Sequence, residues 1–310
     1  MIHFVTTKLH GYTVTNLIDR QGAELCKHWN YENLFAQTDL PQGTWIFTDH
    51  ERLFPTTLQG AAFIAKQLQL RGDRVLNNPA LVRSRYEVLR RLQEAGINRF
   101  SVYRADSNPQ PRRFPVFIRN EHNHLSDGIF LIQDQEEWDE ELELMESKGI
   151  PLIGKLVIEY CGEEFLPETW RRFSSYCIGG KIISHHTGFD DQWIVKDGFD
   201  AEKLENHPDR EELLSMERNF VMQNQYDEIL REVFSIARID YGRADFSIYD
   251  GQIQVFKINT NPMHGREEEV LAQSHPGRRD TLIRSEDILQ QAIKGLHGNS
   301  LDTPGQSTGN

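Results

Sequence analysis

The chain has 310 residues, of which 38% are hydrophobic and 26% are charged, a composition typical of a globular protein with two or three compact lobes. Its formal net charge is −13. This charge repels phosphate backbones and anionic membrane surfaces, so we expect neither nucleic acid nor a membrane as a general partner.

The cysteines and the first residues indicate a compartment. Cys26, Cys161 and Cys177 lie far apart, without the close spacing of zinc or redox motifs, which indicates reduced thiols. The stretch MIHFVTTKLHGY holds an apolar run too short for the core of a signal peptide, and no stretch approaches the length of a membrane span. We therefore expect a cytoplasmic protein.

The first part of the chain predicts alternating strands and helices. Residues 1–7 and 44–53 are typical of strands that lead into polar loops, and residues 57–72 have helical spacing, which indicates an α/β arrangement. In the next stretch, Asn78 is expected to cap a helix that has Pro79 in its first turn and that ends at Gly96.

The middle of the chain predicts a hairpin and an acidic helix. Residues 114–132, FPVFIRNEHNHLSDGIFLI, predict two short strands joined by a long polar loop that ends in an Asp-Gly turn pair. Residues 134–149 predict a helix with Trp138, Leu142 and Met145 on one face, and their acidic residues indicate a solvated face.

The second half is rich in strands and then in helices. Residues 151–165 and 171–189 predict strands, with Gly179-Gly180 as a tight turn, and residues 209–239 predict one or two helices. A last helix is expected from about Glu286 to Leu296, followed by a polar tail that we expect to be disordered.

Two predicted strands in RADFSIYDGQIQVFKIN carry polar residues that can meet. If the loop holds the three residues 250–252, Asp245 lies opposite Lys257; a two-residue loop would set Asp245 opposite Phe256. The first register gathers Asp245, Lys257 and Asn259 on one surface, backed by an apolar face. Such a set can bind phosphate with magnesium. The alternative is an ordinary cross-strand ion pair on a half-solvated sheet.

The stretch IARIDYGRADFSIYDGQIQVFKINTNP resembles the metal-binding end of the ATP-grasp superfamily, of the glutathione synthetase, ribosomal-protein-modifying ligase and D-alanine ligase type. The resemblance covers roughly residues 77–262. It implies an α/β (α+β) fold in which two lobes grip ATP after a small α/β domain. The implied divisions are 1–77, 78–152 with a phosphate loop at 120–128, 153–297, and the tail 298–310. It also implies Asp245 and Asn259 as magnesium ligands.

The resemblance further implies how the nucleoside is held. Glu159, in LVIEYCGEE, falls where a strand of the family crosses between the lobes and contacts adenine, beside the main chain of Tyr160 and Cys161. Glu164 is then expected to reach the ribose.

Several arginines are implied at the phosphates. Arg119 and Arg85 fall where the family usually has nucleotide-binding lysines, and arginine can bind phosphate with its planar fork. Arg172 and Arg243 are expected near the transferred phosphoryl group, where positioned cations stabilise charge; the alternative for each is a surface arginine that covers apolar groups. Arg266 is a candidate for a substrate carboxylate.

The histidines are weak candidates. Those within HNH at 122–124 lack a supporting set of zinc ligands. His185 and His186 are neighbours on a predicted strand, so we expect at most one of them to face a site.

Lys257 stands where the family pattern has a glutamate that bridges two metal ions. The exchange removes a ligand and changes the local charge by two units. Three interpretations remain open: an active ligase in which Lys257 does part of the work of the second ion, a nucleotide-binding protein that has lost ligation, and an inactivating change in an ordinary enzyme.

The first hypothesis from the sequence is an ATP- and magnesium-dependent ligase, with Lys257 among its catalytic residues. It would activate a small-molecule or peptide carboxylate as an acylphosphate for attack by an amine. The alternatives are a non-catalytic nucleotide sensor or interaction protein and a phosphotransferase on the same fold. The substrate and the oligomeric state are not predicted.

Overall fold

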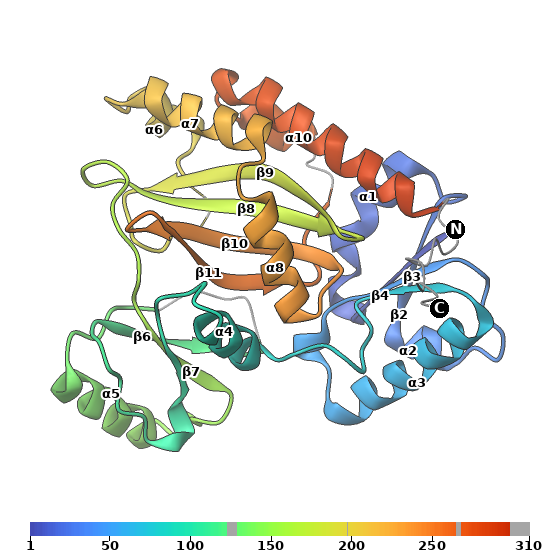
Figure 1. The fold of residues 1–310 in the computed structure, drawn as a ribbon, viewed down its shortest axis with the longest axis horizontal. Helices are drawn as coiled ribbons and strands as arrows, with labels where there is room; N and C mark the ends of the chain where they lie inside the picture. The colour runs from blue at the N-terminus through green and yellow to red at the C-terminus, as the bar shows by residue number, and fades with distance from the viewer. Residues whose placement is uncertain (123–128, 197, 265–267, 298–310) are drawn as a thin grey trace, which may run out of the picture.

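The computed structural model describes residues 1–122, 129–196, 198–264 and 268–297, with no side-chain detail for residues 268–270. Its strands form three sheets, which lie at the right, the centre and the lower left of Figure 1. Within these described ranges, no helix is both long enough and apolar enough to cross a membrane.

The first sheet is parallel and has the strand order β2-β1-β3-β4. All residues of β1 are buried, as expected of a central strand with both faces covered. The predicted α/β alternation is confirmed, although β2 was missed because only two of its five residues are buried. The elements of this part are β1 (Ile2–Thr6), α1 (Thr15–Gln21), β2 (Cys26–Asn30), α2 (Tyr31–Phe35), β3 (Thr44–Phe47), α3 (Pro55–Arg71) and β4 (Arg74–Leu76).

The second sheet is antiparallel and has the order β5-β7-β6. Its strands are β5 (Val102–Arg104), β6 (Val116–Asn120) and β7 (Lys155–Glu159). The helix α5 (Gln135–Ser147) follows the prediction: Asp134 caps it, and Trp138 and Met145 are buried. The predicted second strand of the 114–132 hairpin is reduced to one bridge between Ile132 and Val116, on the edge of β6 opposite β7.

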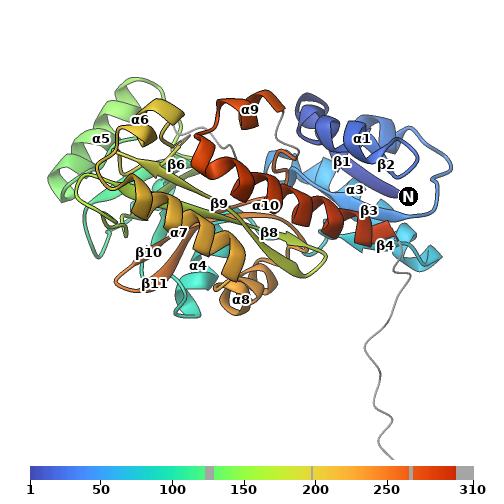
Figure 2. The same cartoon turned by 90° about the horizontal axis from the view of Figure 1, so that it is seen from above.

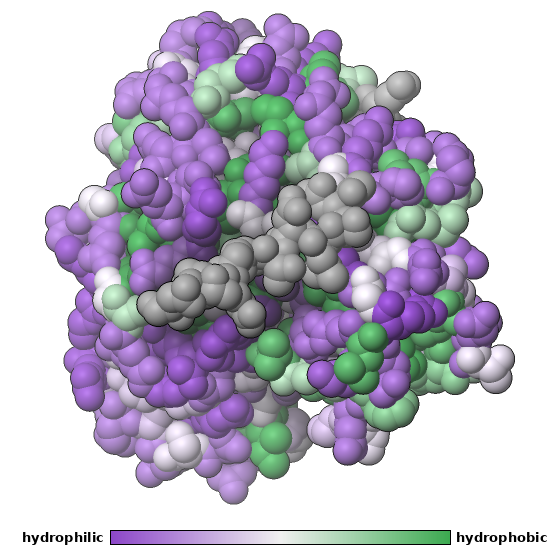
Figure 3. All heavy atoms as spheres, turned by 45° about the vertical axis from the view of Figure 1, so that its right-hand side comes forward, coloured by the Kyte–Doolittle hydropathy of each residue, from purple (hydrophilic) through white to green (hydrophobic). Residues whose placement is uncertain are grey.

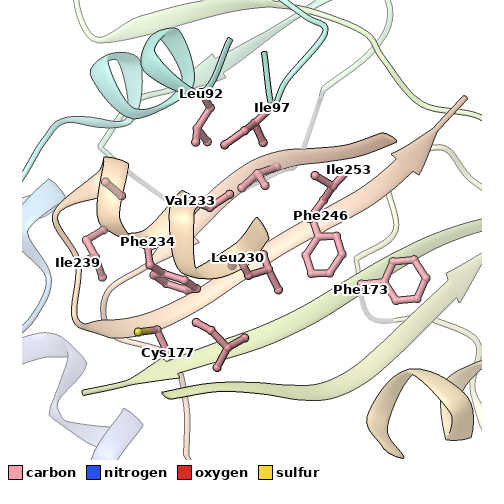
Figure 4. Packing of buried hydrophobic residues seen from close by; sticks show 14 of the residues in the cluster. Leu92, Ile97, Phe173, Cys177, Leu230, Val233, Phe234, Ile239, Phe246 and Ile253 are labelled. Carbon is pink, nitrogen blue, oxygen red and sulfur yellow. The ribbon is translucent and has the colours of Figure 1, made fainter. Parts of the chain in front are cut away.

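The third sheet is antiparallel and has the order β11-β10-β8-β9. Figure 4 shows one of its faces, where side chains of the strands, such as Phe173 and Phe246, pack with Leu230, Val233 and Phe234. The elements of this part are β8 (Trp170–Ile178), β9 (Lys181–Asp190), α6 (Ala201–Glu205), α7 (Arg210–Gln223), α8 (Asp227–Ala237), β10 (Tyr241–Tyr249) and β11 (Gln252–Asn259). The opposite face carries polar side chains such as Asp245 and Lys257 over part of its area, whereas Ile178, Ile183 and Tyr241 join a second hydrophobic cluster.

The register of β10 and β11 confirms the pairing of Asp245 with Lys257, but not by the predicted loop. Tyr249 pairs with Gln252, so the loop has two residues, Asp250 and Gly251, whose φ angles of 47° and 72° are those of a tight hairpin turn. A β-bulge restores the pairing: Asp245 lies opposite Lys257 and the next residue lies opposite Val255, which leaves Phe256 without a partner.

The helix predicted from Asn78 begins later. The observed α4 (Arg85–Glu94) has Ser84 as its N-cap, with the Ser84 hydroxyl accepting a hydrogen bond from the Glu87 amide. The Asn78 side chain instead accepts from the amide of Ala80 at 3.0 Å, which closes a short turn. Because α4 contributes to the cores of both the second and the third sheet, it joins them.

The last long helix, α10 (Pro276–Lys294), begins ten residues before the predicted start, with Pro276 at its first position; the shorter α9 (Glu268–Gln273) precedes it. Figure 2 shows α10 running from the third sheet to the first. Its residues Leu289 and Ile293 share a core with Ile2 and Phe4 of β1, and the Thr44 hydroxyl donates a 2.8 Å hydrogen bond to the carbonyl of Leu296. The first and third sheets are therefore built around one common core.

Hydrophilic side chains cover most of the face drawn in Figure 3, and hydrophobic ones appear there in small separate groups. The three cysteines are all described, and each is buried and free of a disulfide. Their free state agrees with the reduced thiols expected from the sequence.

Candidate functional site

A cavity of about 650 Å³ lies between the polar face of the third sheet and the β6–β7 side of the second. Its volume is in the range of small-molecule and cofactor sites. Residues of β6, β8, β9, β10 and β11 line it, as do the segments that follow β7 and β9. Three groups of side chains divide its wall: cations around one carboxylate, aromatic rings, and histidines with a glutamate.

Four cations meet at one end of the cavity. Arg119 comes from β6, Arg172 from β8, Arg243 from β10 and Lys257 from β11. Burial lowers the pKa of Arg119, although the charge of Asp245 opposes that shift. The buried Nε of Arg119 has no hydrogen-bond partner among the described residues. The Arg172 guanidinium is anchored through Nη1, which donates to the carbonyls of Val195 at 2.7 Å and Lys196 at 2.9 Å.

The Asp245 carboxylate lies among these cations and accepts three hydrogen bonds from its neighbours. Arg243 donates to both of its oxygens, from Nε at 2.8 Å and from Nη2 at 3.0 Å. The Ser174 hydroxyl donates to Oδ1 at 2.9 Å, and Lys257 Nζ lies 3.8 Å from Oδ2. The alternation predicted from the sequence thus brings Arg243, Asp245 and Lys257 to one face.

The proximity of these charges sets their protonation. Burial raises the pKa of Asp245, but Arg243, Arg172 and Lys257 outweigh burial, so the net pKa lies far below its usual range. Burial likewise opposes the charge of Arg243, yet the Asp245 carboxylate holds the pKa of Arg243 above its ordinary value. Burial, together with the neighbouring arginines, lowers the pKa of Lys257 to about 7 despite Asp245. Positive charge is therefore in excess at this end.

Aromatic rings form another wall. Trp193 contacts both Phe117, with ring centroids 5.3 Å apart, and Tyr160, at 5.2 Å. The Trp170 indole donates to the Tyr160 hydroxyl at 3.2 Å, and Phe256 also lines the cavity. Sequence alternation placed Phe256 on the face opposite Lys257; the bulge turns it into this wall instead. These flat apolar surfaces suit the two faces of a purine or another planar group.

Histidines and a glutamate form the third part of the wall. The expectation that at most one of His185 and His186 faces a site is wrong: both line the cavity, because a β-bulge between Ser174 and Ser175 skips His185 in the register. Nε2 of His185 lies 3.3 Å from the Glu286 carboxylate, and the Nδ1 atoms of the two histidines are 2.8 Å apart. Glu286 arrives from α10, so no local sequence signal placed it here.

The predicted adenine contact needs correction. The Glu159 side chain is 2% exposed and lies outside the cavity lining. Its carboxylate accepts hydrogen bonds from the Ser101 amide at 2.8 Å, the Tyr103 hydroxyl at 2.8 Å and the Arg112 amide at 3.1 Å. Arg113 Nε lies 3.5 Å away. These donors hold the carboxylate toward β5 and the segment that follows it.

The other predicted nucleotide residues divide between the cavity and the core. Tyr160 lines the cavity, whereas Cys161 is buried in the core of the second sheet. Glu164 is exposed and accepts from the Glu168 amide at 3.0 Å; its neighbour Glu163 lines the cavity in its place. Arg85 lines a separate small pocket together with Lys257, and its Nη1 donates to the Asn120 carbonyl at 2.7 Å. Most of the predicted loop 120–128, and Arg266, lie outside the described residues.

The architecture has relatives among solved structures. The ATP-grasp ligase PsnB, complexed with its minimal precursor, is similar over 92% of this chain and 98% of its own, with 12% identity and a TM-score of 0.51. The VanG D-Ala:D-Ser ligase from Enterococcus faecalis is similar over 95% and 98%, with 10% identity and a TM-score of 0.52. This chain has the ATP-grasp fold.

A third similar ATP-grasp structure is the D-alanine–D-alanine ligase from Bacillus anthracis complexed with ATP, which covers 94% of this chain and 98% of its own at 12% identity and a TM-score of 0.50. No protein-family description and no curated protein sequence matches the chain. At such identities the likeness establishes the ATP-grasp fold, as the resemblance in the sequence implied, and leaves the chemistry to the side chains.

The side chains do not fit the magnesium ion that the ATP-grasp resemblance implied. Both oxygens of Asp245 accept hydrogen bonds from Arg243, and the Asn259 amide oxygen accepts from the backbone of Asn261 at 3.0 Å, so a metal ion would compete with these donors. The described residues include no cluster of three or more His, Cys, Asp or Glu side chains that could hold a metal ion. Each pair of like unit charges at roughly 4 Å costs about 4 kcal/mol at an effective dielectric of 20, so the Lys257 ammonium would repel a divalent cation beside Asp245.

Proposed function

We propose that this chain is an ATP-dependent ligase that joins a carboxylate to an amine. One observation carries the proposal: a single cavity of about 650 Å³ combines a cationic end, an aromatic wall and a histidine–glutamate pair. A nucleotide and two smaller reactants would use these three environments: the rings for the nucleoside, the cations for the phosphates, and the histidines for the proton that the amine loses. The similar ligases of the same fold support the assignment, although each is a distant relative.

The aromatic wall would take the nucleoside and the cations would take the phosphates. Trp193, Tyr160 and Phe117 offer ring faces, and Arg119 lies on the strand that leads away from Phe117 along β6. Arginine and lysine stabilise the charge of a transferred phosphoryl group by position alone, without covalent chemistry of their own. Magnesium enters no step of this proposal, because the residues at Asp245 do not fit it.

The reaction balances in two steps. An oxygen of the substrate carboxylate attacks the terminal phosphorus of ATP, the bond to the bridging oxygen breaks, and ADP leaves with that electron pair. The amine nitrogen then attacks the acyl carbon, inorganic phosphate leaves, and the nitrogen loses a proton. We assign the acceptance of that proton to the paired imidazoles of His185 and His186, with the Glu286 carboxylate 3.3 Å from His185 to stabilise an imidazolium.

A non-catalytic nucleotide-binding protein is the second candidate. One observation favours it: Lys257 and Arg243 together neutralise the carboxylate of Asp245, the acidic residue expected at the phosphates. Such a protein would bind ATP and hold it without turnover. The two candidates therefore differ in the fate of the bound nucleotide.

The test measures release of ADP by the full chain, with and without pools of amino acids and peptides. A ligase releases ADP in proportion to the acceptor and forms an amide that mass spectrometry detects, and Glu286→Gln slows turnover while ATP binding is retained. Asp280→Asn, on the same helix and outside the cavity lining, is the matched control. ATP binding without turnover in any pool, with hydrolysis appearing only in Lys257→Glu, would establish the non-catalytic candidate.

A further inference from the structure

The cationic end of the cavity carries a charge opposite to that of the whole chain. Arg119, Arg172, Arg243 and Lys257 surround the carboxylate of Asp245, so these five groups carry three positive charges in excess when Lys257 is protonated and two when it is neutral. The chain as a whole has a formal net charge of −13. An excess of this kind, inside an acidic protein, is a site for a multiply charged anion.

The cations are distributed in a way that suits an extended anion. Arg119 belongs to the second sheet, whereas Arg172, Arg243 and Lys257 belong to three neighbouring strands of the third. An anion that contacts all four must therefore span the space between the two sheets. A chain of phosphoryl groups has charged oxygens along its whole length, which a single carboxylate or one phosphate lacks.

Lys257 stands at the position where the ATP-grasp pattern has a metal-binding glutamate. Its side chain is 13% exposed, its ammonium lies 3.8 Å from Asp245 Oδ2, and the guanidinium of Arg243 donates to both oxygens of the same carboxylate. Two protein cations thus contact the carboxylate that the resemblance assigned to a metal ion. Magnesium prefers oxygen ligands in near-octahedral geometry, and this end of the cavity offers nitrogen donors instead.

Resting on the proposed binding of ATP, we propose that this cavity takes the nucleoside triphosphate without a divalent cation, with protein cations contacting the phosphates directly. Magnesium bound to the triphosphate neutralises part of its charge and covers oxygens that the four side chains would contact. The metal complex is therefore the weaker ligand. The group that the cations bind is therefore a polyphosphate chain that carries no metal ion.

The test compares two forms of one ligand on the full chain. Isothermal calorimetry with ATP in EDTA, and then with saturating magnesium, gives the two affinities. We expect free ATP to bind at least about tenfold more tightly than its magnesium complex. Inorganic tripolyphosphate in EDTA should compete with ATP, since the tail is the part that the cations contact.

Two variants test whether Lys257 sets the preference. Lys257→Glu places a second carboxylate opposite Asp245 and should invert the preference in favour of magnesium-ATP. Lys257→Met keeps an unbranched side chain of similar length and should weaken binding of free ATP, which provides a second measurement if the glutamate variant does not fold. Lys181→Glu, on the exposed start of β9, makes the same change of charge away from the cavity and should leave the wild-type preference intact.

The outcomes separate this inference from the proposed function. Tighter binding of magnesium-ATP by the wild type, or loss of all ATP binding in EDTA, overturns the inference while ligation with magnesium would stand. Binding of neither form overturns both. Binding of free ATP without turnover keeps the inference and removes the ligase.

Discussion

Replacing Glu159 tests two possible roles of its side chain. The sequence resemblance implies that it contacts adenine, whereas the structure shows its carboxylate holding other groups of the protein. Its buried carboxylate accepts from the amides of Ser101 and Arg112 and from the hydroxyl of Tyr103. Glu159→Ala would leave these donors without their acceptor. A hydrogen bond to a charged group contributes about 1.5–3 kcal/mol, and water can replace the acceptor at the exposed Arg112, so we expect a loss of about 3–5 kcal/mol in the free energy of unfolding.

Urea unfolding of Glu159→Ala and Glu159→Gln measures that loss, and the glutamine variant, which keeps one oxygen, should lose about 1–2 kcal/mol. The affinity for ATP, measured by calorimetry on the folded fraction, should change less than about threefold. Trp193→Ala is the matched comparison, since Trp193 lines the cavity and contacts Tyr160: it should weaken ATP binding with a smaller effect on unfolding. Unchanged stability with a large loss of ATP affinity in the Glu159 variants would refute this reasoning.

Two further predictions concern stability. Arg278 of α10 donates to both carboxylate oxygens of the buried Glu217 of α7 at 2.7 Å. Arg278→Ala would leave a buried charge unpaired, so the free energy of unfolding measured in urea should fall by about 3–5 kcal/mol. Glu217→Leu combined with Arg278→Met should recover most of that loss, and a double variant as unstable as Arg278→Ala would contradict this expectation. Burial lowers the pKa of His3, His50 and His264 from 6.5 to about 4. Between pH 6.5 and 4 the unfolded chain therefore binds more protons than the folded chain. The free energy of unfolding should then fall as the pH is lowered over this range, by up to about 3 kcal/mol for each histidine. Denaturant midpoints measured from pH 7.5 to 4.5 check this, and a midpoint that stays constant or rises toward acid pH would contradict it.

Local patterns predicted most elements of this fold, and tertiary pairing decided the rest. The helix α5 was predicted with its buried Trp138 and Met145 because amphipathic spacing is a local property. The strand expected at 129–132 is reduced to the bridge between Ile132 and Val116, and the strand that pairs with β6 along its length is β7, which follows later in the chain. The start of α10 was missed because its His275 cap and Pro276 precede the apolar residues on which the prediction depended.

The candidate site was predicted in part. Strand alternation brought Asp245 and Lys257 together, yet the pairing depends on a bulge at Phe256 that no alternating pattern contains. The same kind of irregularity brought both His185 and His186 into the cavity. Groups supplied by distant segments, such as the two backbone amides and the hydroxyl that donate to Glu159, could not be predicted from motifs, because they depend on which segments meet in space.

The core shared by β1 and α10 has a consequence for how the chain folds while it is made. Residues between 2 and 46 pack against Leu289, Ile293 and Leu296, which are synthesised much later. Contacts of such sequence separation are slow to form, because the long intervening chain must first be closed. The first sheet thus has to wait, with part of its apolar surface uncovered, until α10 has been synthesised. Chaperone demand during translation should concentrate on this sheet rather than on the two that grip the cavity.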